Sequence, residues 1–247
     1  MYRHFFDYLR EMRVNHLIPL DVLYVYYAHY EEPADKDGSE TCTLLEYLKA
    51  EGYRMVDKVE GLDYEHCKMA LTSLAHYHAL TMSALLEWVT KFTPKMSKVN
   101  IVETLESSGP LVCIVHGDYW SNNMLFKYED GIPVSLLMLD FQLSRIGHPL
   151  GDVAYFLYTS TLPETRQKYL HDLLCHYFDT LTTDLRLLGI SLDNYNMDNI
   201  WADFKKSSLK WMFRGIMALS MSQNKQVVTN LKEANAKQLK QPKLEED

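Results

Sequence analysis

The chain has 247 residues and a formal net charge of −8, from 25 Lys and Arg against 33 Asp and Glu. This balance argues against a nucleic-acid partner, because affinity for phosphate backbones depends on clustered Lys and Arg. With 47% hydrophobic residues, the chain can bury the core of one large domain, or of one domain plus a fragment.

Cysteine usage and the N-terminal residues indicate the compartment. The four cysteines show no CxxC spacing, which favours a reducing environment; they are Cys42, Cys67, Cys113 and Cys175. Residues 1–13 mix charged and aromatic side chains and lack the apolar stretch of a secretory signal. No run of about 18 uncharged apolar residues occurs, so no membrane span is expected. We therefore expect a soluble, cytoplasmic protein.

The first part of the chain changes from strand-like to helical patterns. Apolar residues at helical spacing predict a short helix from Tyr2 to Val14. Residues 22–30 and 41–47 are rich in β-branched and aromatic residues and predict two strands, joined by the polar loop 31–40. From Asp63 to Phe92 the period is again helical, which predicts one long helix.

The second part predicts a hairpin followed by helices. A buried strand is expected over 111–115, then a polar loop over 116–123, and then a hairpin with strands 124–128 and 134–139. Three helices are expected, over 153–160, 164–189 and 198–221. The charged tail 224–247 predicts a solvated helix or disorder.

The polar loop and the end of the hairpin carry the residue types that phosphoryl transfer needs. Transfer from ATP requires a carboxylate to orient and deprotonate the attacking hydroxyl, and oxygen ligands for Mg²⁺. Asp118 in the His-Gly-Asp string is a candidate for the first role, and Asn123 with Asp140 for the second. Asp and Asn are also common loop residues, but three such residues around one hairpin favour the chemical interpretation.

The register of the hairpin decides whether Asn123 and Asp140 meet. A four-residue loop over 130–133 would pair Tyr128 with Ser135 and place Asn123 opposite Asp140. Residues opposite one another in an antiparallel pair lie about 4.5–5.5 Å apart at Cα, close enough to share a metal ion. A two-residue loop would shift this register by two.

The strings HGDYWSNN and DFQ resemble the catalytic core of the small-molecule kinases: the choline kinases, the aminoglycoside phosphotransferases and, most closely, the ecdysteroid kinase-like (CHK kinase-like) family. The resemblance implies that Asp118 is the catalytic base, that Asn123 and Asp140 hold Mg²⁺, and that His116 braces the loop. A comparable aspartate, Asp152, would also brace the loop, although its place before an apolar helix predicts an N-cap.

Further segments match the same family. Residues 45–49 (LEYLK) resemble the hinge whose backbone holds adenine, which implies nucleotide contacts at Glu46 and Leu48; the end of an edge strand is the alternative interpretation. The segments 61–63 and 74–79 resemble the helix that follows the hinge. The resemblance covers about Val22 to Met221.

Two elements of such kinases do not occur in this sequence. No glycine-rich loop is found, and no lysine precedes Lys36. The expected organisation is therefore a remnant of the small lobe over 1–48, a helical catalytic lobe over 49–222 and a charged tail over 223–247. Either the chain is an N-terminally truncated kinase, or it is an inactive pseudokinase-like binding or regulatory protein.

The resemblance implies an α+β, protein-kinase-like fold, with a mostly helical C-terminal lobe and a partial N-terminal β lobe. It implies an ATP- and Mg²⁺-dependent phosphotransferase that acts on the hydroxyl of a small molecule, steroid-like or an amino alcohol. Aromatic residues of the later helices are expected to line the acceptor pocket: Tyr155, Tyr158, Trp201 and Trp211. The sequence leaves the acceptor and the oligomeric state open.

Overall fold

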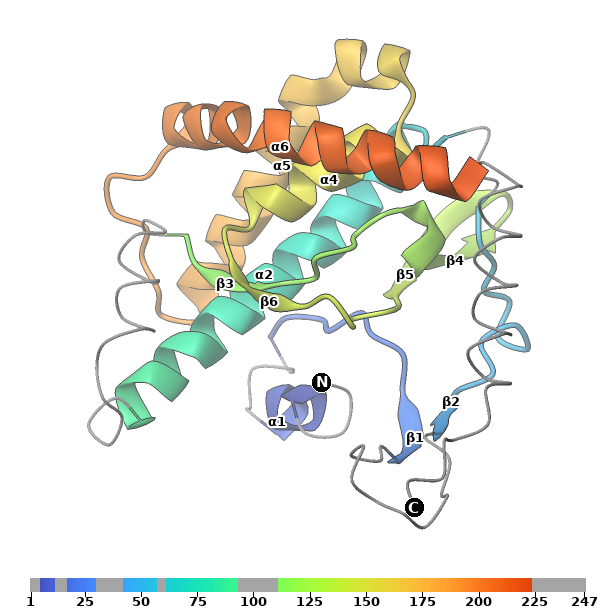
Figure 1. The fold of residues 1–247 in the computed structure, drawn as a ribbon. Coiled ribbons are helices and arrows are strands. Elements are labelled where there is room, and N and C mark those ends of the chain that lie inside the picture. Colours follow the sequence, from blue (N-terminus) through green and yellow to red (C-terminus); the bar gives the residue numbers. More distant parts are fainter. Residues whose placement is uncertain (1–4, 12–16, 30–41, 57–60, 93–110, 224–247) are drawn as a thin grey trace, which may run out of the picture.

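The structure is a computed structural model of the 247-residue chain, and it describes residues 5–11, 17–29, 42–56, 61–92 and 111–223. In this part of the chain, four long helices and a short N-terminal one surround three small antiparallel sheets (Figure 1). The loop predicted over 31–40 and the tail predicted over 224–247 lie outside the described residues.

The N-terminal elements lie at one end of the molecule (Figure 1). Helix α1 (Phe5–Glu11) forms within the predicted helix and buries Phe6 and Leu9 in the core. Strands β1 (Val25–His29) and β2 (Cys42–Leu45) pair in an antiparallel sheet, as their composition predicted.

Helix α2 (Tyr64–Phe92) runs through the middle of the fold (Figure 1). Asp63 begins it, since its carboxylate accepts hydrogen bonds from the backbone N–H and the Nδ1–H of His66. Leu71, Leu74 and Ala75 on this helix are fully buried. The long predicted helix is thus confirmed, and its apolar face forms part of the main core.

The hairpin is formed by β4 (Met124–Glu129) and β5 (Ile132–Met138). It follows β3 (Cys113–Val115) and the short 3-10 helix η3 (Ser121–Asn123). Strand β6 (Arg145–Gly147) pairs with β3 and was not predicted. Its three residues are too few to show a period in the sequence.

The predicted register of the hairpin is wrong by one residue. The turn is a two-residue loop, Asp130 and Gly131, with φ of 49° and 81°, the left-handed geometry that suits the twist of a hairpin. A β-bulge then follows, because Lys127 pairs with Ser135 while Tyr128 pairs with Pro133. Compared with the predicted four-residue loop, the two-residue loop shifts the register by two residues, and the bulge shifts it back by one. Asn123 therefore lies opposite Leu139, whose N–H donates to the Asn123 carbonyl over 2.9 Å.

Three helices complete the fold: α4 (Leu150–Ser160), α5 (Pro163–Leu187) and α6 (Met197–Gln223). Helix α5 packs against α2, and α6 crosses α4 on the near face in Figure 1. Small residues allow the crossing of α4 and α6, since a Cβ on Gly151 would lie 2.8 Å from the Trp211 ring. This crossing holds Trp211 beside Tyr155, with ring centroids 5.9 Å apart. None of the described helices is long and apolar enough to cross a membrane.

Candidate active site

His116 is the buried centre of the polar loop. The backbone N–H of Asp118 donates to its Nδ1 over 3.3 Å, so the proton resides on Nε2, which donates to the Leu139 carbonyl over 2.8 Å. One imidazole ring thus joins the loop to the residue directly before Asp140. Burial lowers the pKa of His116 below its ordinary value of 6.5, despite the nearby carboxylates Asp152, Asp118 and Asp140, and keeps the ring neutral.

Asp152 binds the backbone of the same loop. Its carboxylate is fully buried and accepts hydrogen bonds from the N–H of His116 over 2.6 Å and the N–H of Gly117 over 3.0 Å. Burial alone would raise the pKa of the Asp152 carboxyl, but hydrogen bonds from His78 and from the backbone N–H of Gly117 hold it below its ordinary value.

The predicted N-cap role of Asp152 is wrong. Helix α4 starts at Leu150, after Pro149, which makes no side-chain cap, so Asp152 lies inside the first turn. Two backbone N–H groups of the loop, together with Nε2 of His78 at 3.2 Å, take up its carboxylate instead. These contacts agree with the role that the family resemblance implies, in which this aspartate braces the loop, and not with capping of the helix.

Asp118 lies between an amide and a phenol. The Asn123 amide nitrogen donates to its Oδ2 over 3.1 Å and to its backbone carbonyl over 2.9 Å. The Tyr155 hydroxyl donates to Oδ1 over 2.9 Å. Both carboxylate oxygens are therefore oriented, which suits a carboxylate that must accept a proton from a defined direction. Burial and the negative charge of Asp118 raise the pKa of Tyr155, which keeps the phenol protonated as a donor.

Asp140 lies two residues beyond the end of β5. Its φ of 60° is unusual for a residue other than glycine and turns the chain away from β5. The next residue, Phe141, is buried against the His116 ring, with centroids 4.4 Å apart, and against Phe6 of α1, with centroids 4.8 Å apart. The aromatic anchor and the left-handed residue fix the position of Asp140 where the strand pairing does not.

Asn123 and Asp140 offer oxygen atoms of the kind that bind Mg²⁺. Because both contacts of Asn123 to Asp118 use its amide nitrogen, its Oδ1 is the atom left for a cation. Asp140 supplies a carboxylate, one oxygen of which accepts from Gln142 over 3.3 Å. Among the described residues there is no group of three or more His, Cys, Asp or Glu that could hold a metal. Such a site suits Mg²⁺ held by few protein oxygens together with phosphates.

The hinge candidates lie in a turn that follows β2. The N–H of Glu46 donates to the Tyr24 carbonyl over 3.2 Å, which continues the pairing of β1 with β2. Leu48 is 7% exposed, and its carbonyl accepts from the N–H groups of Glu51 and Tyr53. Arg54, just beyond, exchanges backbone hydrogen bonds of 2.9 Å with Phe126 of the hairpin. This segment is thereby joined to the strand that follows Asn123.

The aromatic residues expected around an acceptor do not all meet. Tyr155 donates a hydrogen bond to Asp118, and Trp211 packs on the Tyr155 ring. Tyr158 instead lies under the Arg166 guanidinium, and Trp201 lies against His171, with ring centroids 5.9 Å apart. Tyr155 thus contacts the candidate base directly, and Trp211 is linked to it through Tyr155.

Two contacts of the site were not foreseen. Tyr155 was expected only as a pocket residue, and no contact of His78 with Asp152 was expected. The periodicity of their helices shows which face each residue occupies, but it gives no sign of a polar partner about 37 or 74 residues away in the chain.

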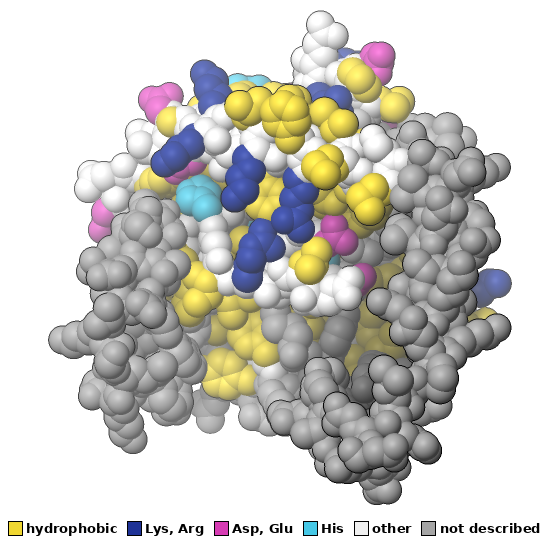
Figure 2. Space-filling model, in the orientation of Figure 1, with side chains coloured by type: hydrophobic (Ala, Val, Ile, Leu, Met, Phe, Trp, Pro, Cys, Tyr) yellow, Lys and Arg dark blue, Asp and Glu magenta, His cyan; other side chains and the backbone are white. Residues whose placement is uncertain are grey.

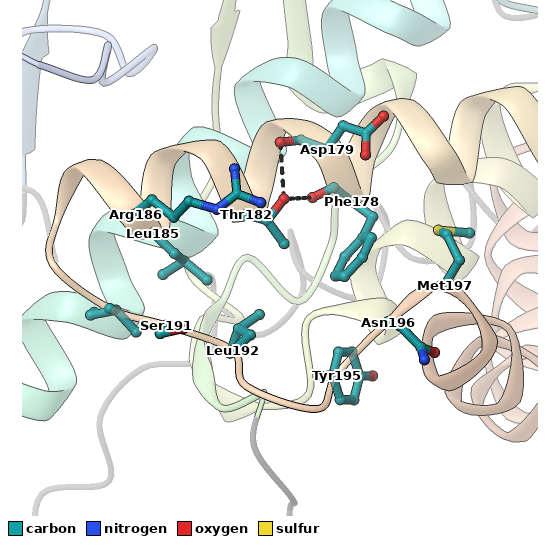
Figure 3. Close-up of a pocket in the computed structure, with 11 residues that line it drawn as sticks. Phe178, Asp179, Thr182, Leu185, Arg186, Ser191, Leu192, Tyr195, Asn196 and Met197 are labelled. Atoms are coloured by element: carbon teal, nitrogen blue, oxygen red, sulfur yellow. Dashed lines mark hydrogen bonds between the residues drawn. The ribbon is translucent and has the colours of Figure 1, made fainter.

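Two pockets lie outside this site. One of about 290 Å³ lies where α5 ends and the chain turns towards α6, with Phe178, Leu192 and Tyr195 around it (Figure 3). The other, of about 480 Å³, lies beside the start of α2 and is bordered by Arg54, His66 and Tyr128 among others. None of the site residues predicted from the sequence lines either pocket.

A loop braced by a buried aspartate, a hairpin and a DFQ turn are features of the kinase-like phosphotransferases. The model of the ecdysteroid kinase-like family matches residues 1–100 and 87–190, well over half of the chain. The chain belongs to the ecdysteroid kinase-like family. The predicted fold class, α+β and protein-kinase-like, is confirmed by this membership and by the helices and antiparallel sheets described above.

Other relatives are more distant. The human acyl-CoA dehydrogenase family member 11 is 26% identical over 154 residues, which cover 60% of this chain and 16% of that protein. The chain thus spans about a sixth of the length of that relative. Among solved structures, choline kinase from Cryptosporidium parvum is 11% identical with a TM-score of 0.44, covering 85% of this chain and 68% of the other. Ethanolamine kinase from Plasmodium vivax is 12% identical with a TM-score of 0.39, covering 87% and 71%.

Proposed function

We propose that this chain is the catalytic part of a small-molecule kinase, which transfers the γ-phosphoryl group of ATP to an alcohol. The observation that supports this most directly is the Asp118 carboxylate, held by Asn123 on one oxygen and by Tyr155 on the other. Membership of a kinase-like family supports the reaction class. The expected lobe boundaries, 1–48, 49–222 and 223–247, belong to the same proposal.

In this proposal Asp118 accepts the proton of the acceptor hydroxyl as its oxygen attacks the γ-phosphorus. The Tyr155 hydroxyl and the Asn123 amide keep the carboxylate aligned during the attack. Asn123 Oδ1 and Asp140 would hold Mg²⁺, which would supply positive charge against the phosphates. ADP leaves with the electrons of the broken bond.

The remaining residues position the catalytic loop and the two substrates. His116 and Asp152 keep the loop in shape through the hydrogen bonds to Leu139 and to the loop backbone. Backbone groups of Glu46 and Leu48 would contact adenine. The acceptor would reach Asp118 from beside the Tyr155 side chain, whose hydroxyl keeps its hydrogen bond to the carboxylate. A cytoplasmic location is part of the same proposal.

The test is ATP turnover with Mg²⁺ and a panel of small alcohols, using the chain and its Asp118→Asn variant. The substitution keeps the shape and removes the proton acceptor, so turnover should fall by about 10²–10⁴-fold. Glu129→Gln, an exposed carboxylate at the end of β4, is the matched control and should retain turnover. Equal turnover by wild type and Asp118→Asn would refute the assignment of the base.

A further inference from the structure

Three cationic side chains lie around the ring of Trp211, which packs on Tyr155, the hydrogen-bond donor to the proposed base. The guanidinium carbon of Arg145 lies 5.4 Å from the centroid of the Trp211 ring, the ammonium of Lys210 5.7 Å and the guanidinium carbon of Arg214 5.3 Å. Arg145 comes from β6 and the other two come from α6. We call these three side chains the basic cluster. Figure 2 shows Lys and Arg side chains gathered on the face that α6 crosses.

Two short chains of contacts connect the basic cluster to Asp118. The Trp211 ring meets the Tyr155 ring edge-on, and the Tyr155 hydroxyl donates to Asp118. On the other path, a Cβ added to Gly117 would lie 2.5 Å from Nη1 of Arg145, so this guanidinium rests on the residue before Asp118. Arg214 is near enough to oppose, in part, the rise in the pKa of Tyr155 that burial and Asp118 cause.

The three side chains of the basic cluster form no ion pair within the described part of the chain. None of the ion pairs formed there involves Arg145, Lys210 or Arg214. Arg145 gives one N–H to the Leu143 carbonyl, and all three side chains belong to exposed residues. Three like charges around one ring are separated by about a Debye length or less, so they repel one another and favour an anion between them.

The position of the basic cluster indicates which ligand would supply that anion. Oδ2 of Asp118 faces Asn123, on the side proposed for Mg²⁺ and the nucleotide, whereas Oδ1 faces Tyr155 and the basic cluster. While the acceptor hydroxyl attacks the γ-phosphorus, the rest of the acceptor molecule lies on the side of Asp118 away from the metal. A group carried by the acceptor therefore falls nearest to the three cations.

We propose that the acceptor alcohol carries a negatively charged group, such as a carboxylate or a phosphate, which the basic cluster binds. This inference rests on the proposed function and narrows its substrate class. Charge-assisted hydrogen bonds from two guanidinium groups suit a planar carboxylate or a phosphate. An amino alcohol, which is cationic at neutral pH, is disfavoured by the same three charges.

Three benzyl alcohols that differ in one para substituent test the charge of the acceptor: para-hydroxymethyl benzoate, benzene dimethanol and para-aminomethyl benzyl alcohol. Binding is measured without ATP by ligand-observed NMR, and turnover is measured with ATP and Mg²⁺. The benzoate should bind at least about tenfold more tightly than the amine, and Arg214→Gln or Arg145→Gln should each weaken its binding by about tenfold.

Lys205→Gln is the matched control. Lys205 precedes Arg214 by nine residues on α6, two and a half turns, so it points to the opposite side of the helix. The control removes the same charge and should leave benzoate binding unchanged. Absent binding of the benzoate, equal or tighter binding of the amine, or benzoate affinity that survives both arginine substitutions would overturn the proposal.

The two readouts separate this proposal from the proposed function. Benzoate binding that depends on the arginines, without phosphorylation of any of the three alcohols, would retain the anion site and argue against phosphoryl transfer. Phosphorylation of the amine in preference to the benzoate would support phosphoryl transfer and argue against the anion site. If the arginine variants lower kcat equally for all three alcohols and leave KM for the benzoate unchanged, the basic cluster serves the transferred phosphate, and the inference about the acceptor is wrong.

Discussion

The Tyr155 hydroxyl donates a hydrogen bond to Oδ1 of Asp118 over 2.9 Å, while Oδ2 of the same carboxylate accepts from Asn123. A helix residue and a loop residue thus hold the candidate base from two sides. In a phosphotransferase this arrangement fixes the direction from which the carboxylate approaches a hydroxyl, which is the main contribution that a protein makes to this chemistry.

Tyr155→Phe removes one of these hydrogen bonds and little else. A hydrogen bond to a charged group is worth about 1.5–3 kcal/mol, so kcat should fall by about tenfold or more. KM for ATP should stay unchanged, because Tyr155 lies on the side of Asp118 away from the proposed nucleotide. Steady-state kinetics separate the two quantities. Tyr169→Phe on α5 is the control and should behave as wild type; a higher KM for ATP with unchanged kcat in Tyr155→Phe would contradict the assigned role.

Gly117 and Gly131 form a matched pair, since both have a positive φ, 85° and 81°. A Cβ on Gly117 would lie 2.3 Å from the Leu143 carbonyl oxygen, whereas a Cβ on Gly131 meets nothing within 4 Å. Gly131→Ala should therefore lower the free energy of unfolding by about 1 kcal/mol, the strain of a left-handed alanine. Gly117→Ala should lower it by about 3 kcal/mol, since the steric overlap adds to this strain.

Urea unfolding curves measure both glycine variants. Gly117→Ala should also lose turnover, because the loop residue before Asp118 must shift. Equal destabilisation by the two substitutions would show that the contact between Gly117 and Leu143 does not constrain the loop.

Asp140→Asn tests the cation side of the site. Replacing a carboxylate by an amide keeps one oxygen and removes the charge, so the Mg²⁺ concentration for half-maximal turnover should rise by about tenfold to a hundredfold. At saturating Mg²⁺ part of the turnover should return. The measurement is a magnesium titration of Asp140→Asn and of the control Asp130→Asn, which changes an exposed residue. An unchanged Mg²⁺ concentration for half-maximal turnover in Asp140→Asn would remove Asp140 from the proposed ligands.

His116 predicts a dependence of stability on pH. Because burial lowers its pKa in the folded state, the unfolded chain takes up a proton first as the pH falls below the ordinary value of 6.5. The contribution of neutral His116 is thus complete above about pH 6.5 and decreases as the pH falls from there towards the folded-state pKa. His116→Asn should lose less unfolding free energy than wild type between about pH 7.5 and pH 5.5.

His148 and His176 also have lowered pKa values from burial and remain in the variant, so the difference between the two proteins isolates His116. Denaturant unfolding at several pH values provides the measurement. His171→Asn, on the exposed side of α5, should follow wild type. Identical pH dependence of wild type and His116→Asn would mean that the ring is not buried as a neutral group.

Patterns that depend on neighbouring residues could be predicted from the sequence. The long helices were foreseen because apolar side chains recur along each of them at helical spacing, as in α2 and α5. The hairpin was foreseen from its turn residues. Strand β6 was missed because three residues, two of them exposed, carry no alternation.

Features that depend on distant contacts could not be predicted. The two-residue loop and the bulge at Pro133 together place Leu139, and not Asp140, opposite Asn123. Asp152 was expected to cap a helix, since the sequence does not show that the buried N–H groups of His116 and Gly117 would lie within reach. The family resemblance supplied this position because it carries tertiary information that a single sequence lacks.

The tight turn at Asp130 and Gly131 also bears on how the protein folds. Every pairing of the β4–β5 hairpin joins residues close together in the chain, so little loop entropy opposes its formation, and a left-handed turn of this type starts it readily. The contacts from α4 to the loop span 35–37 residues and must come later. We expect Asn123 to be placed early in folding, Asp140 to be placed when Phe141 packs against Phe6 and His116, and the candidate base to be oriented when α4 packs against the loop.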